Sequence, residues 1–168
     1  MHAIHLITTG GTIEKMYSEQ SGAVLNSASK IGQYLSRLRL PDCDVRVLSL
    51  MNKDSLEMTP EDRADLVSEM ARLLPDQLPI VITHGTDTMV ETGVYIQKTF
   101  PQLNVPVILT GAMTPLGFEG SDGLQNLTES LLAARLVPPG VYVVMHGQVL
   151  PANHVRKDRD QATFVRVS

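Results

Sequence analysis

The chain has 168 residues, of which 43% are hydrophobic and 19% charged, a composition that suits one soluble globular domain with a single sizeable core. Fourteen basic and 18 acidic residues give a net charge of -4, and no run of Lys or Arg forms a stripe that could follow a phosphate backbone. The length argues against a second full domain, and the charge argues against nucleic acid as a partner.

The cysteine count and the hydropathy pattern are used to predict the cellular compartment. Cys43 is the only cysteine, so an internal disulfide is impossible, and we interpret it as a small buried hydrophobe. The first residues show no basic segment followed by a long apolar run, and no later stretch approaches the about 20 apolar residues of a membrane span. We therefore expect a cytoplasmic protein that does not enter the membrane.

Short apolar runs alternate with segments of helical period, which is the order typical of a parallel sheet with crossover helices. Strands are predicted, in chain order, at 3–8, 44–50, 79–83, 105–110 and 140–145, and the alternating segment 162–167 predicts a last one.

Three of the intervening segments carry apolar residues at helical spacing. These residues are Ile31, Tyr34, Leu35 and Leu38, then Leu66, Met70 and Leu73, and finally Leu124, Leu127, Leu131 and Ala134. Thr59 offers a cap hydroxyl and Pro60 suits the first helical position, so the second helix is predicted to begin at Pro60. We therefore predict an α/β fold: a doubly wound, open parallel sheet with helices on both faces (Rossmann-like), in a single domain.

In open sheets of this class, binding sites lie beyond the carboxyl ends of the strands. The first such end is Thr8-Thr9-Gly10-Gly11-Thr12, where two glycines allow a tight turn and close approach of a ligand, and Thr12 follows with a free hydroxyl. A glycine turn with a capping threonine is the alternative interpretation. Neither a phosphate loop nor a dinucleotide fingerprint is present.

A second strand end, Thr83-His84-Gly85-Thr86-Asp87-Thr88, is too polar for a segment that only has to pack. A threonine hydroxyl is a weak nucleophile, so its use requires a nearby base and donors for the oxyanion that forms. Asp87 is adjacent to Thr86, and Lys157 follows the last clear strand. A carboxylate and a lysine could supply the proton relay if the fold brings them together.

These residues carry a resemblance to a known family. Segments 7–14 and 81–89 resemble the two signature motifs of the bacterial-type L-asparaginase family, which includes asparaginase/glutaminases. The similarity continues through Thr110-Gly111-Ala112-Met113 and Ser121-Asp122-Gly123 to Lys157. It implies that residues 1–168 form a catalytic domain of the N-terminal asparaginase type.

The resemblance also implies roles for individual residues. Thr12 would be the nucleophile that attacks the side-chain amide, and Thr86, Asp87 and Lys157 would form a second cluster that activates it or a water molecule. Tyr17 stands where the family has a mobile lid tyrosine.

The substrate would be held by residues from several strand ends, which are Gly11, Ser55, Glu57, Thr86, Asp87 and Ala112. Ser55 would take the substrate α-carboxylate, Asp87 would face the α-amino group, and Ala112 would offer a backbone carbonyl near the leaving amide.

The chain departs from the family pattern in two respects. Family members usually carry a C-terminal domain that helps complete the site of a neighbouring subunit, and here the sequence ends soon after Lys157, so it resembles a compact variant without that domain. Leu56 occupies a position where many relatives have a polar side chain. Apolar surface left by the missing domain leads us to expect a homo-oligomer.

The implied function is hydrolysis of L-asparagine to L-aspartate and ammonia through an acyl-enzyme, with no metal or organic cofactor. The histidines are scattered, and His2 and His5 fall on opposite faces of a predicted strand, so no metal centre is predicted. Two alternatives stay open: an amino-acid-binding or sensing module with little turnover, and an amidase acting on glutamine or another amide.

Overall fold

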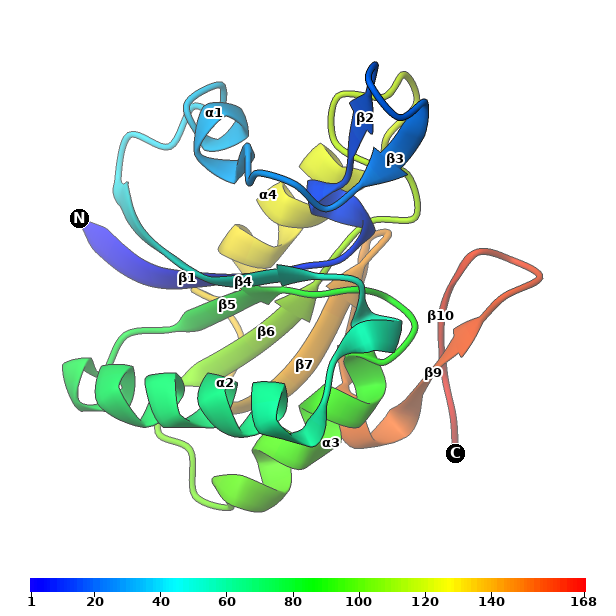
Figure 1. Cartoon of the computed structure of the whole chain (residues 1–168). Coiled ribbons are helices and arrows are strands. Elements are labelled where there is room, and N and C mark those ends of the chain that lie inside the picture. The colour runs from blue at the N-terminus through cyan, green and yellow to red at the C-terminus, as the bar shows by residue number, and fades with distance from the viewer.

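The computed structural model describes residues 1–168 and has three layers, with a central sheet between two pairs of helices (Figure 1). The sheet has six strands in the order β4-β1-β5-β6-β7-β8, and only β8 runs antiparallel to its neighbour. The strands are β1 (His2–Gly10), β4 (Cys43–Lys53), β5 (Ile80–Thr83), β6 (Pro106–Thr110), β7 (Gly140–Met145) and β8 (Gln148–Pro151). The predicted single α/β domain is confirmed, although β8 was not predicted.

Four α-helices connect the strands: α1 (Ile31–Leu35), α2 (Pro60–Leu73), α3 (Met89–Thr99) and α4 (Gly123–Ala133). Helix α2 begins at Pro60 as predicted, because Thr59 and Asp62 form a capping box in which each side chain accepts from the other's backbone N–H. Helix α1 is shorter than predicted and ends before Leu38. None of the helices combines the length and the apolar character that crossing a membrane would require.

The sheet is buried on both faces, so β5 and β6 are apolar up to the threonine that ends each of them, Thr83 and Thr110. In β5, Ile80 and Ile82 belong to the core cluster that contains Leu66 of α2, whereas Val81 belongs to the cluster that contains Leu127 of α4. Helices α2 and α3 thus cover one face and α1 and α4 the other, as Figure 1 shows below and above the sheet.

The crossover through α4 differs in hand from the other three. From β1 to β4 the chain crosses the sheet in one direction, with α1 on the upper face. From β4 to β5 and from β5 to β6 it crosses in the opposite direction, with α2 and α3 on the lower face. Because direction and face are both reversed, these three crossovers have the same hand. From β6 to β7 the chain crosses in the same direction as from β5 to β6, yet α4 lies on the upper face, so this crossover has the opposite hand. Parallel crossovers are right-handed in about 98% of cases. We therefore assign the crossover through α4 as the left-handed exception.

Two hairpins stand beyond the carboxyl edge of the sheet, one at the top and the other at the right of Figure 1. One joins β2 (Met16–Ser18) to β3 (Ala23–Leu25), and the other joins β9 (Val155–Asp158) to β10 (Thr163–Arg166). The predicted strand 162–167 is therefore confirmed as β10. Short 3-10 turns complete the fold: η1 (Thr12–Glu14), η2 (Ser55–Glu57), η3 (Leu74–Asp76) and η4 (Ala152–His154).

Candidate active site

The two threonine-bearing strand ends flank the point where the winding of the sheet reverses. From β1 the chain departs toward β4 on one side, while β5 begins the series that leads to β7 on the other, and β1 and β5 are neighbours. Ligand crevices in doubly wound sheets form at this switch point, outside the carboxyl ends of the strands. Thr12 follows β1 and Thr86 follows β5, so the fold sets their loops side by side.

Direct contact between the loops is visible at their glycines. A Cβ added to Gly11, whose φ is +79°, would lie 2.4 Å from the Cα of Gly85. A Cβ on Gly85 would in turn lie 2.5 Å from Oγ of Ser55. The loops after β1, β5 and β4 are therefore stacked at van der Waals distance, and neither glycine leaves room for a side chain. The predicted residues Gly11, Thr12, Ser55 and Thr86 come together here.

Lys157 joins the second loop from a distant part of the chain. Its Nζ donates to Oγ1 of Thr86 at 2.7 Å and to Oδ1 of Asp87 at 2.9 Å. The Lys157 side chain is 17% exposed, so its charge is largely shielded from solvent. The predicted cluster of Thr86, Asp87 and Lys157 is thus assembled in the structure.

The inward direction of Lys157 follows from the pairing of β9 with β10. Lys157 lies opposite Phe164 in this antiparallel pair, and opposed residues share one face of a hairpin. Phe164 is fully buried in the core cluster that also contains Ile96 of α3. Val155, two residues before Lys157, belongs to the same cluster. The apolar anchors therefore turn Lys157 toward the sheet edge, whereas Arg156 between them is exposed.

Asp87 has a second cationic partner that the sequence did not indicate. Nη2 of Arg159 lies 2.8 Å from Oδ1 of Asp87, the same oxygen that Lys157 contacts. Burial by itself raises the pKa of the Asp87 carboxyl, but Lys157 and Arg159 overcome this effect and hold that pKa below its usual value. Asp87 is therefore ionised at neutral pH.

The turn that carries Thr12 is supported from beneath by Glu14. Oε2 of Glu14 accepts from the Gly10 N–H at 2.7 Å and from the Thr83 hydroxyl at 3.3 Å, which ties the ends of β1 and β5 together. Burial raises the pKa of the Glu14 carboxyl, while these two hydrogen bonds oppose the rise. A glutamate beside a glycine turn gives no sequence signal of burial, and its contribution was missed.

His84 supports the Thr86 loop through a buried chain of hydrogen bonds. Burial lowers the pKa of His84 to about 4, so its ring is neutral at pH 7. Its Nδ1–H donates to the Gly85 carbonyl at 2.8 Å, which leaves Nε2 to accept from the Thr92 hydroxyl at 2.8 Å. Nε of Arg63 then donates to the Thr92 oxygen at 3.0 Å. The network connects α2, α3 and the turn at Gly85.

Ser55 is buried in the first position of η2. Its Oγ accepts from the Thr88 N–H at 3.3 Å, while its carbonyl accepts from the Thr88 hydroxyl at 3.0 Å. Asp54 caps η2 and pairs with Lys15 at 2.7 Å. Glu57 lies exposed on the same turn, and Leu56 projects into solvent with 70% of its surface exposed.

The loop after β6 closes the site on the side of α4. Ala112 is fully buried, and the Leu116 N–H reaches the Ile13 carbonyl of the Thr12 turn at 3.3 Å. This contact depends on the unusual crossover, because the loop must pass over the sheet edge to reach the face that α4 covers. A Cβ added to Gly111, the residue before Ala112, would lie 3.5 Å from Cγ2 of Thr86, so this loop adjoins the Thr86 loop.

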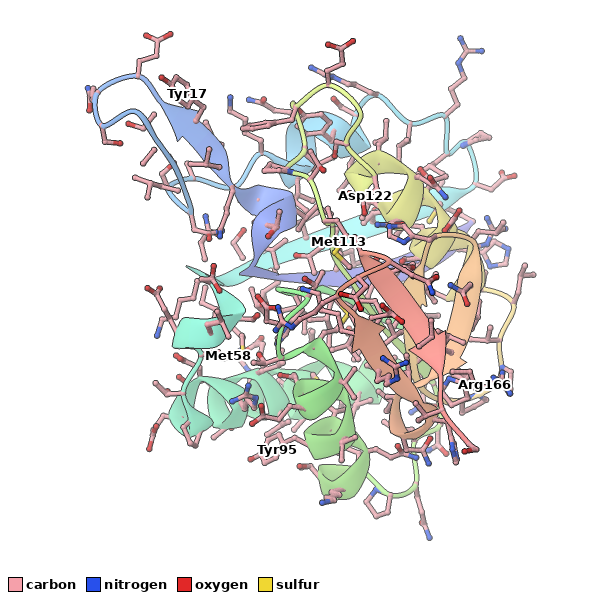
Figure 2. All side chains as sticks on the ribbon, turned by 90° about the vertical axis from the view of Figure 1, so that its right-hand side faces the viewer. Tyr17, Met58, Tyr95, Met113, Asp122 and Arg166 are labelled. Carbon is pink, nitrogen blue, oxygen red and sulfur yellow. The ribbon has the colours of Figure 1, made fainter.

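An acidic side chain holds this loop in shape. Asp122 accepts from the backbone N–H groups of Met113 and Thr114 at 3.0 Å, and it lies 2.6 Å from Nε2 of His146. Nδ1 of His146 lies 2.7 Å from Oγ1 of Thr163 in β10. The loop after β6 is thereby connected to the hairpin that carries Lys157. Figure 2 shows Met113 and Asp122 close together at the sheet edge.

Tyr17, the predicted lid residue, is not brought to the cluster. It pairs with Val24 in the β2–β3 hairpin and is 57% exposed, and no hydrogen bond joins it to another side chain. In Figure 2 it lies at the outer end of that hairpin, away from Met113 and Asp122. No group of three or more His, Cys, Asp or Glu side chains is arranged to hold a metal ion.

Comparisons with known proteins agree with this architecture. Residues 3–164 match the family model for the N-terminal part of asparaginase. The L-asparaginase of Thermococcus kodakarensis is 31% identical over 90% of this chain and 46% of its own length. A subunit of the glutamyl-tRNA(Gln) amidotransferase from Sulfolobus acidocaldarius is 30% identical over 86% of this chain and 33% of its own.

A solved structure gives the same result. The thermostable L-asparaginase from Thermococcus kodakarensis superposes with a TM-score of 0.86 and 30% identity, over 98% of this chain and 51% of that one. The fold and the stacked threonine loops define an α/β domain whose candidate site lies at the switch point of the sheet. The chain belongs to the asparaginase family, and it spans from a third to about half of the length of the relatives it matches.

Proposed function

We propose that residues 1–168 form a catalytic domain that hydrolyses L-asparagine to L-aspartate and ammonia. The single observation that carries the proposal is the pair of contacts from Lys157 to Thr86 and Asp87, at 2.7 and 2.9 Å, beside the Thr12 loop. A hydroxyl, an amine and a carboxylate in one hydrogen-bonded row can move a proton to and from a reacting oxygen.

The proposed first step is acyl transfer to Thr12. Its Oγ attacks the side-chain amide carbon, the C–N bond breaks, and the hydroxyl proton leaves with the nitrogen as ammonia. The product of this step is an ester between Thr12 and the aspartyl group. The close stacking of Gly11 on Gly85 supports this step, because a substrate bound at the Thr86 loop also reaches the Thr12 turn.

Hydrolysis of the ester is proposed to use the second cluster. Water attacks the ester carbon, and its proton passes through the Thr86 hydroxyl to Lys157, which is proposed to act in this step as the neutral amine after giving up one ammonium proton; a proton then returns to Oγ of Thr12 as aspartate leaves. Asp87 keeps Lys157 in line and faces the α-ammonium of the substrate. Ser55 would receive the α-carboxylate, and Glu57 and Ala112 keep their proposed places around the substrate. Tyr17 is proposed as a lid residue that acts from the β2–β3 hairpin, outside the cluster.

An ammonia-release assay on L-asparagine tests the proposal. Thr12→Ala and Thr86→Ala should each lower the rate to background, while Thr128→Ala should match the wild type, because Thr128 lies exposed on α4 and only bonds back to its own helix. Circular dichroism and thermal unfolding establish that each variant is folded. Full activity in both site variants would contradict the proposed roles.

A second candidate is release or transfer of ammonia from a different amide. The relative from Sulfolobus acidocaldarius belongs to an amidotransferase and has nearly the same identity as the L-asparaginase relative. The same assay on L-glutamine distinguishes the two, since a higher kcat/KM for glutamine would favour this candidate. Saturable binding of asparagine in calorimetry without ammonia release would instead indicate a binding or sensing module.

The quaternary state and the compartment are also proposals. Leu132, Leu136 and Val149 are exposed apolar side chains, and their surface supports the expected homo-oligomer. Light scattering at micromolar concentration tests it. The proposed cytoplasmic location rests on the single free cysteine, Cys43.

A further inference from the structure

Arg159 stands at the mouth of the site and shares an oxygen with Lys157. Both side chains contact Oδ1 of Asp87, at 2.8 Å from Arg159 and 2.9 Å from Lys157. The two cations differ in their surroundings. Lys157 is 17% exposed and also donates to Thr86, whereas Arg159 is 70% exposed and lies just beyond the end of β9.

We propose that Arg159 is a specificity residue that competes with the α-ammonium group of the substrate for Asp87. The inference rests on the proposed function, in which Asp87 receives that group. Because Lys157 is anchored by Thr86 and by its place opposite buried Phe164, Arg159 is the cation that an incoming ammonium displaces. Asp54 of the neighbouring η2 turn already pairs with Lys15.

The competition sets a preference among amides. A substrate with an α-ammonium must break the pair between Arg159 and Asp87, whereas an amide without that group leaves the pair intact. Exposed ion pairs contribute about 0 to 1 kcal/mol, and the larger of these values corresponds to about a fivefold change in an equilibrium constant. Arg159 therefore raises the KM for α-amino amides by up to about fivefold and acts little on kcat.

Two amides distinguish competition for Asp87 from a general effect of the Arg159 charge on substrate binding. L-Asparagine carries the α-ammonium, and succinic acid monoamide is the same molecule without its α-amino group. We expect Arg159→Gln to lower the KM for L-asparagine about two- to fivefold and to leave the KM for succinic acid monoamide unchanged or higher. Arg156→Gln is the matched control, because Arg156 is exposed on β9 and pairs only with Asp158 at 3.6 Å.

An unchanged or higher KM for L-asparagine in Arg159→Gln overturns the proposal, and so does an equal fall for both amides. Failure of the proposed function gives a different result: the wild type then releases no more ammonia than Thr12→Ala. In that event calorimetry with L-asparagine decides the role of Arg159. Tighter binding by Arg159→Gln than by the wild type supports the competition, and equal or absent binding in both overturns it.

Discussion

Lys157 Nζ donates to the Thr86 hydroxyl at 2.7 Å across 71 residues of sequence. This contact exists because β9 pairs with β10 and Phe164 fixes the face of the hairpin that turns inward. The candidate site therefore depends on a small element outside the main sheet. The stability of that hairpin and the chemistry of the site should be separable by mutation.

Lys157→Met should lower kcat by at least about 100-fold, because positioned acid and base groups contribute about 10² to 10⁴ in rate. The change keeps most of the side-chain volume and removes the proton carrier next to Thr86. Lys98→Met, at an exposed position near the end of α3, should retain wild-type kinetics. A Lys157→Met enzyme within fivefold of the wild type would show that Lys157 does not take part in proton transfer.

Gly11→Ala should cost more stability than Gly22→Ala. Both glycines have positive φ, at +79° and +67°, so each substitution bears a backbone cost of about 1 kcal/mol. Only at Gly11 does the new Cβ meet backbone, 2.4 Å from the Cα of Gly85, whereas Gly22 faces open space. Urea unfolding measures the difference, and equal losses for the two variants would mean that the loops after β1 and β5 are not stacked.

His84 should make the protein less stable as the pH falls below about 6.5. Its folded pKa of about 4 is lower than its unfolded value of 6.5, so the unfolded state binds the extra proton in this window. Between pH 7.5 and 4.5 this effect amounts to about 2 to 3 kcal/mol.

His84→Asn removes the titrating ring but keeps a donor for the Gly85 carbonyl. The free energy of unfolding of this variant should fall less than that of the wild type between the same two pH values. Parallel pH profiles for the two proteins would contradict a buried neutral imidazole at His84.

Asp122→Ala should destabilise the fold by about 2 to 4 kcal/mol, because it leaves the N–H groups of Met113 and Thr114 and the ring of His146 without their acceptor. Asp44→Ala removes an exposed pair with Arg46 and should cost less than about 1 kcal/mol. Chemical denaturation of both variants at pH 7 checks the contrast.

Asp122 should also contribute to acid unfolding. Its backbone and His146 partners overcome the effect of burial and hold the pKa of Asp122 below the usual 3.8. The stabilisation is therefore complete above pH 3.8 and is lost as the pH falls through the lower folded value. In Asp122→Asn the acid transition should be shallower than in the wild type.

Much of the fold could be predicted because its signals are local. The central strands are continuous apolar runs, and Thr59 with Pro60 fixes the start of α2, so both follow from spacing and capping. The alternation around Phe164 likewise indicated β10. Its partner β9 could not be predicted, because Val-Arg-Lys-Asp holds one apolar residue and shows no alternation. Its pairing is decided by the burial of Phe164 in the tertiary core.

The same distinction between local sequence signals and contacts of distant segments applies to the site residues. Thr12, Thr86 and Asp87 follow strand ends, where this class of sheet has its sites, and the resemblance to the asparaginase family grouped them. Glu14 and Arg159 could not be predicted, since the burial of one and the ion pair of the other arise only when distant loops meet. The face on which α4 packs was also beyond prediction, because its left-handed crossover contradicts the usual rule.

The most direct measurement of the central claim is peptide mass spectrometry after the reaction with L-asparagine is quenched in acid. The Lys157→Met variant, with ester hydrolysis slowed, should accumulate an aspartyl adduct on the peptide that contains Thr12, and the adduct should vanish in a Thr12→Ala background. An adduct on the peptide that contains Thr86, or steady ammonia release with no adduct on either threonine, would contradict the account.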